Sequence, residues 1–198
     1  MFKKSTNTTL FILFLIGLTS ISYGFDGQRK GFILGLGLGG GLTSFTQTVE
    51  IGESSQTSDR ENKFSFISDF RIGYAPSNLV EVYYNAKVAW FSLDNIFDES
   101  VTITDGLNGI GITYHLKPQA PSGFVNGAIG LAVFDAPFES GFEAWTGFGF
   151  SAGGGFEFSP HWRVEGNIIY GKPGREESGV SVSTNSLVFK VTVNVMAF

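Results

Sequence analysis

Apolar and polar side chains alternate with a period of two along much of this chain. The pattern is clearest in three segments, residues 64–74, 80–90 and 162–170. In the first segment Phe66 and Phe70 share one parity, and Asp69 and Arg71 share the other. Such alternation predicts β-strands with one apolar face and one polar face.

Five further segments carry weaker versions of the same pattern: residues 31–46, 101–116, 123–134, 144–158 and 180–198. In the first of these, leucines alternate with glycines, and in residues 144–158 phenylalanines alternate with glycines. No helical periodicity separates the segments. The sequence therefore predicts an all-β fold of eight strands.

The connections between these strands alternate between short and long. The short ones are residues 75–78, 117–122 and 159–161, each with a proline that fixes the backbone of a turn. The long, polar ones are residues 47–62, 92–100, 135–143 and 172–183. This pattern is typical of an eight-stranded antiparallel transmembrane β-barrel with short periplasmic turns and longer external loops. An even strand count places both ends of the chain with the short turns.

A soluble barrel with the apolar parity inside is the alternative. The interior of an eight-stranded barrel is only just wide enough to be filled by side chains. The Phe, Leu, Ile and Val residues of the apolar parity would not fit there together. The Gly, Ala, Thr and Asn residues of the other parity suit a narrow lumen, so we expect the apolar parity to face lipid. Backbone groups at that depth must be paired, which a closed barrel achieves.

Tyr and Trp residues of the apolar parity lie near both ends of the predicted strands. They are Tyr74, Tyr114 and Trp162 at the end with short connections, and Trp90 and Tyr170 at the end with long ones. Two such aromatic belts are typical of membrane interfaces, because these rings are amphipathic. Trp145 lies on the polar parity of its segment, and a bulge or loop position would account for it.

The first 24 residues have the pattern of a secretory signal peptide. Lys3 and Lys4 precede the short apolar run at residues 10–18, and Ser22 and Gly24 fit a cleavage site after Gly24. A membrane anchor helix is the alternative, but this run is about half of the roughly 20 residues that span a bilayer. We therefore expect a signal peptide at 1–24, a barrel domain at 25–198, and export to the bacterial outer membrane. With no Cys, disulfides play no part.

Charge narrows the choice of partners. Two of the 13 basic residues lie in the predicted signal peptide, which leaves 11 against 18 acidic residues and a net charge of −7. Nucleic-acid-binding proteins select basic patches, so we expect no nucleic acid partner.

The polar parity carries both signs of charge. Its members are Asp69, Arg71, Glu81, Lys87, His115, Glu157, Arg163, Glu165 and Lys190. Four acids match four bases, and neighbouring strands bring Asp69 and Arg71 beside Glu81 and Lys87, and Glu157 beside Arg163 and Glu165. Buried charges need such partners. A satisfied polar core that closes the lumen is the favoured interpretation, and a gated ion path is the alternative.

Catalysis and cofactors have little support in the sequence. The two histidines, His115 and His161, lie at the short-turn end, whereas barrel enzymes that modify lipid work from the outer leaflet. No catalytic grouping is visible on the long-loop side. The glycine runs at 35–41 and 153–155 precede no helix, so they are not phosphate loops. We therefore expect no enzyme, no cofactor and no metal.

The mature chain resembles the small outer-membrane β-barrel proteins related to the OmpA transmembrane domain and the opacity-type proteins. The resemblance rests on the first strand (GLGLGGGL, residues 35–42), the hairpin SAGGGFEFSPHWRVEGNIIYG (residues 151–171) and the terminal Phe198. It implies a barrel, and a C-terminal Phe recognised by the barrel-assembly machinery. In such barrels the final Phe shares parity with the apolar residues before it. Here Phe198 and Met196 share parity with the polar residues Lys190 and Asn194. Either a bulge near the end restores the phase, or the assembly signal is atypical.

Three functions follow in order of preference. The first is a non-catalytic barrel with a structural or surface-interaction role through its external loops, in contact with outer-membrane lipid and with an external ligand or host surface. The loops at 47–62, with four acidic residues, and at 135–143, with Phe138 and Phe142, are the candidate contact sites. The second is a narrow channel for ions or small solutes. The third is a lipid-modifying barrel enzyme.

Overall fold

The computed structural model describes residues 27–94, 100–177 and 179–198, which form strands and no helix. The strands are β1 (Gly31–Ile51), β2 (Ser54–Thr57), β3 (Glu61–Ser77), β4 (Val80–Asp94), β5 (Ser100–His115), β6 (Ser122–Asp135), β7 (Trp145–Ser159), β8 (Trp162–Glu177) and β9 (Val180–Ala197). None of these residues forms a helix long and apolar enough to span a bilayer. The predicted signal peptide lies outside the described residues.

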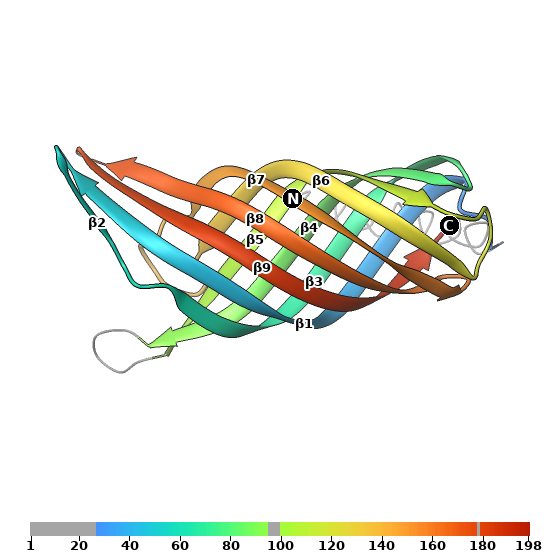
Figure 1. Cartoon of the computed structure of the whole chain (residues 1–198), viewed down its shortest axis with the longest axis horizontal. Helices are drawn as coiled ribbons and strands as arrows, with labels where there is room; N and C mark the ends of the chain where they lie inside the picture. Colours follow the sequence, from blue (N-terminus) through green and yellow to red (C-terminus); the bar gives the residue numbers. More distant parts are fainter. Residues whose placement is uncertain (1–26, 95–99, 178) are drawn as a thin grey trace, which may run out of the picture.

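The sheet is a closed antiparallel barrel, as the alternation predicts. Each long strand pairs with the next one in the chain, and β9 pairs with β1 to complete the circle (Figure 1). Eight strands close the barrel, and β2 is an extra strand that pairs with β1. Following the partners from Gly35 around the barrel leads back to β1 at Phe45, ten residues further along. This stagger sets the tilt of the strands and, with the strand number, the width of the lumen.

The short turns gather at one end of the barrel and the long connections at the other. The C-terminus lies at the short-turn end, and β2 projects from the long-loop end (Figure 1).

Two details of the connections differ from the prediction. The first concerns residues 75–78: β3 continues to Ser77 through a register shift after Tyr74, and only Asn78 and Leu79 turn. Pro76 lies in that irregular stretch, where its missing N–H does not interrupt the ladder.

The second difference concerns the long connections at 47–62 and 172–183, which are largely strand. Strand β1 runs to Ile51, and Gly52 with its φ of 59° begins the tight turn into β2. In the other connection Glu177 pairs with Val180. Polar composition at these positions indicated solvent, but alternation continues through them, and hydrogen-bonded hairpins extend beyond the barrel wall.

The two faces of the wall differ as the volume argument predicts. The outward side chains include large exposed apolar residues, for example Phe64, Leu38 and Ile129. Inward positions alternate between glycines and larger side chains that reach over them. A Cβ at Gly111 would collide with the ring of Tyr83, and one at Gly155 would collide with the ring of Phe124. Glycines therefore provide the room that the large inward side chains occupy.

The predicted belt residues lie on the outer surface. Tyr74, Tyr114 and Trp162 are about half exposed near the short-turn end. At the other end the indole of Trp90 donates to Ser68 over 2.9 Å, and the hydroxyl of Tyr170 donates to Asn185 over 2.6 Å. Each of these two rings thus has a polar partner beside an apolar surface, as at an interface.

The C-terminal residue points into the barrel. Phe198 is 3% exposed, and its ring lies 4.9 Å from that of His161. Strand β9 keeps an unshifted register with β1 as far as Ala197, so no bulge restores the apolar phase. Of the two explanations that the sequence allowed, the atypical ending is the one that fits this geometry.

Gly111 and Gly40 provide a matched test of the packing inside the barrel. We expect Gly111→Ala to lower the free energy of unfolding by about 1–3 kcal/mol, because the new methyl displaces the Tyr83 ring. Gly40 faces outward, and a methyl group on it would approach its nearest neighbouring atom only to 3.9 Å, so Gly40→Ala is expected to change stability by less than about 0.5 kcal/mol. Urea unfolding of the refolded barrel measures both, and equal losses would contradict a tightly filled lumen.

Candidate functional site

The lumen holds a group of ionisable side chains, here called the lumen charge network. Each member is at most 5% exposed. The members are Arg29, Asp69, Arg71, Glu81, Lys87, His115, Glu157, Arg163, Glu165 and Lys190. The sequence predicted nine of these ten to face inward.

Glu165 on β8 holds the centre of the network together. Its two carboxylate oxygens accept hydrogen bonds from Arg71 over 2.6 Å and from Lys87 over 2.7 Å. Lys87 also lies 3.5 Å from Asp69, which forms a close ion pair with Lys190. Two acids and three bases from four strands therefore share a single buried cluster.

A second cluster lies towards the short-turn end and is built around Glu81. Arg163 donates to both oxygens of Glu81 over 3.2 Å, and His115 lies 2.9 Å from one of them. Beyond it, Arg29 makes two hydrogen bonds of 2.9 Å to Glu157. Arg29 also donates to two backbone carbonyls in the turns, those of Asn78 and Lys117. This arginine ties the segment before β1 to the short-turn end of the barrel.

Several close pairs cross the lumen, whereas the sequence predicted pairing along the ladder. One predicted pair of adjacent strands is present, because Arg71 lies 3.8 Å from Glu81. Asp69 and Lys87 are neighbours on adjacent strands as expected, yet Lys87 comes closer to Glu165 on β8. Glu157 lies beside Arg163 in the register but binds Arg29 instead. Long side chains reach the opposite wall because the lumen is narrow and glycines leave space in front of them.

Two buried charges were missing from the sequence prediction. Arg29 precedes the first strand, where no alternation marks it as inward-facing. Asp105 on β5 is 2% exposed and accepts a hydrogen bond from Ser186 over 3.2 Å. Its parity with Gly109 and Gly111 did carry the signal, since those glycines are inward-facing.

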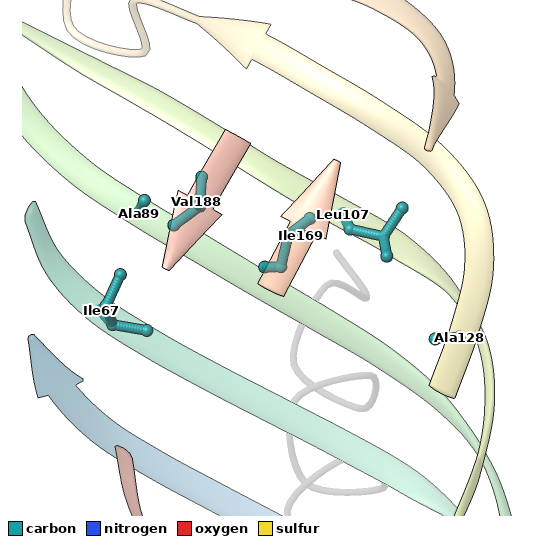
Figure 2. Packing of buried hydrophobic residues seen from close by; sticks show 6 residues of the cluster. All are labelled: Ile67, Ala89, Leu107, Ala128, Ile169 and Val188. Carbon is teal, nitrogen blue, oxygen red and sulfur yellow. The ribbon is translucent and has the colours of Figure 1, made fainter. Parts of the chain in front are cut away.

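An apolar layer crosses the barrel next to the charged centre. It consists of Ile67, Ala89, Leu107, Ala128, Ile169 and Val188 (Figure 2). All six come from the parity that is otherwise polar, and they converge from six strands at one level of the lumen. A charged group that entered this layer would lose its hydration shell without gaining a polar partner from these six side chains.

Aromatic rings close the lumen at the long-loop end. The rings of Phe45, Phe91 and Phe134 lie 5.7 to 6.4 Å apart between centroids. Trp145 stacks on Phe134 at 5.5 Å, and Phe142 from the 135–143 loop packs on Trp145. Trp145 is off phase because it points inward to this cluster, and a bulge is not needed to explain it.

The two histidines lie apart from one another. His115 is fully buried between Glu81 and Glu157, and Nδ1 of His161 lies 3.0 Å from the carbonyl oxygen of Met196. Within the described ranges, no group of three or more His, Asp and Glu side chains is arranged to hold a metal ion.

A closed eight-stranded barrel with an apolar outer surface and a filled polar lumen defines the class of small outer-membrane β-barrels. The chain is similar in structure to the outer membrane protein OprG from Pseudomonas aeruginosa, with a TM-score of 0.50 and 10% identity over 86% of this chain and 97% of that one. At this identity the similarity shows the fold alone.

Two other solved structures show weaker similarity. Neisserial surface protein A has a TM-score of 0.48 and 12% identity, and the alignment covers 84% of this chain and 97% of that one. Ail, the attachment invasion locus protein of Yersinia pestis, has a TM-score of 0.40 and 15% identity, covering 83% and 99%. A comparison with protein-family models finds no match, and neither does one with curated protein sequences.

Glu165 is the position where removing one charge should be most costly. We expect Glu165→Gln to lower the free energy of unfolding by about 3–5 kcal/mol, because Arg71 and Lys87 lose the carboxylate that they share. The control is Glu61→Gln, which affects an exposed pair with Lys63 at 3.6 Å and should cost less than about 1 kcal/mol. Urea titration of both variants in the same lipid tests this, and similar losses would show that the buried pairs contribute little.

Proposed function

We propose that this protein is a non-catalytic outer-membrane barrel whose filled lumen serves as a rigid support for an interacting external end. The short-turn end faces the periplasm in this proposal, and the loops and hairpins at the long-loop end face outward. Outer-membrane lipid contacts the apolar wall, and an external ligand or host surface contacts the exposed end.

The observation that carries the proposal is that three groups of inward side chains follow one another along the lumen. The lumen charge network occupies the half near the short turns, the apolar layer of Figure 2 follows, and the aromatic cluster closes the long-loop end. A barrel interlocked in this way is well suited to hold its ends rigidly. Functional residues commonly lie on loops supported by such scaffolds.

A role without catalysis is supported by what the two histidines already do. The His115 ring is enclosed, and its Nε2 is engaged with Glu81. His161 lies in the turn between β7 and β8, with its ring against Phe198. A general base must reach the substrate atom that it deprotonates. Neither ring is placed at the end that we propose to face the exterior.

A narrow path for ions is the second candidate function. It is favoured by polar atoms that face the lumen without a hydrogen-bond partner in the described protein, among them both amide atoms of Asn85 and Nη2 of Arg163. These groups could bind permeating water. The path would have to cross the apolar layer and the aromatic cluster, which is why we rank it second.

Conductance in a planar bilayer separates the two candidates. We expect the folded wild-type barrel to produce no discrete current steps, because the apolar layer excludes hydrated ions. The double variant Leu107→Ser and Ile169→Ser makes that layer polar and serves as the sensitised control. Steady current steps from the wild-type protein, with an ion selectivity that changes in Lys87→Gln, would refute the filled-scaffold proposal and establish the channel.

A further inference from the structure

Four strands continue beyond the aromatic belt as a small sheet, here called the external sheet. It consists of residues 46–51 of β1, Ser54–Thr57 of β2, residues 174–177 of β8 and residues 180–184 of β9. The hairpins that form it project further than the neighbouring strands at the end marked by β2 (Figure 1). Among the strands that the structure describes, β2 pairs with β1 alone, and its four residues are all exposed.

The apolar phase reverses in the external sheet. In the barrel wall the apolar residues face outward, but here Val49, Ile51, Val180 and Val182 have the parity that faces the lumen. We call the side formed by these four residues the inner face. Ile51 is 59% exposed and Val49 37% exposed, so water reaches apolar side chains there. The outward positions carry polar residues instead, for example Glu50 and Ser181.

Two hollows flank this apolar stripe. One, of about 400 Å³, is lined by Trp145, Arg175, Glu177, Val180 and Val182. The other, of about 390 Å³, is lined by Val49, Ile51, Ser54, Ser55 and Gln56 along β2. An exposed apolar stripe with polar borders is typical of a protein interaction surface. Each hollow is large enough to receive side chains of a partner.

The surroundings of the inner face are acidic. Residues 46–63, 135–145 and 172–184 contain nine acidic and four basic side chains. The basic side chain on the inner face, Arg175, is bound by two carboxylates, Glu143 at 2.8 Å and Glu177 at 3.0 Å. The charge that remains is therefore negative, and it favours a positively charged partner.

We propose that the inner face of the external sheet binds a basic, amphipathic segment of another protein, an inference that rests on the proposed surface role. The apolar side chains of the segment lie on Val49, Ile51, Val180 and Val182, and its basic side chains face Glu143 and Glu177. In an extended conformation the segment also pairs with the free edge of β2.

Two other occupants fit this surface less well. A second copy of the chain would bring the same acidic surroundings against this face, and like charges oppose that contact. Membrane lipid contacts the barrel wall below the Tyr170–Asn185 pair, where the outward residues are apolar. The inner face lies beyond that pair and has the opposite orientation.

The test uses the full folded barrel in nanodiscs of zwitterionic phosphatidylcholine. The probes are two eight-residue peptides, one alternating Lys and Val and the other alternating Glu and Val. We expect the Lys–Val peptide to bind and the Glu–Val peptide to bind at least about tenfold more weakly, a difference that falls as salt rises. Equal binding of the two peptides would overturn the proposal.

Paired variants locate the contact. Ile51→Ser combined with Val182→Ser should weaken the Lys–Val peptide about tenfold, which corresponds to about 1.4 kcal/mol. Glu177→Gln and Glu50→Gln remove the same charge from opposite faces of one sheet, so the first should weaken binding and the second should change it much less. Equal effects of these two variants would overturn the assignment to the inner face.

Two further measurements distinguish peptide binding from dimer formation and from a failure of the filled-scaffold proposal. Sedimentation of the wild-type nanodisc sample should show one barrel per particle, and a dimer that is lost in the Ile51→Ser variant would overturn the proposal in favour of a second copy. If the barrel produces no current steps in the bilayer and also fails to bind the Lys–Val peptide, that result would overturn this inference alone. A barrel that conducts would refute the filled-scaffold proposal on which the inference rests.

Discussion

The width of the lumen is the constraint on which the rest of this structure depends. Eight strands with a stagger of ten residues leave an interior that side chains from the wall can just fill. Every inward side chain must therefore fit against those of the opposite wall. The large inward residues lie over glycines, as Tyr83 lies over Gly111, and the charged ones meet partners from across the barrel.

The lumen charge network follows from the same constraint. A charge on the outer face would lie in lipid, and a charge on the inner face is far from bulk water, so either position needs a partner. Glu165 meets two bases at once, and Glu81 meets Arg163 and His115. The narrow lumen makes these contacts short. The same contacts connect opposite walls of the barrel.

The alternation of apolar and polar residues therefore has opposite phases in two parts of the same strands. Within the barrel wall the apolar parity contacts lipid and the polar parity fills the lumen. Beyond Tyr170 the strands continue with the apolar residues on the other parity, so that Val49 and Val182 face inward and polar residues face outward. This change of phase gives the long-loop end an apolar inner surface of its own.

The sequence by itself determined the barrel, because period-two alternation and the succession of connections are local properties. It also showed which residues face inward, since parity follows from position along a strand. Only the tertiary structure decided which inward residues meet, because Glu165 and Arg71 come together through strand number and stagger. The same holds for Arg29, which precedes the first strand, and for Trp145, whose aromatic partners come from distant strands. Contacts across a closed barrel depend on the curvature of the whole sheet, and no single strand encodes that curvature.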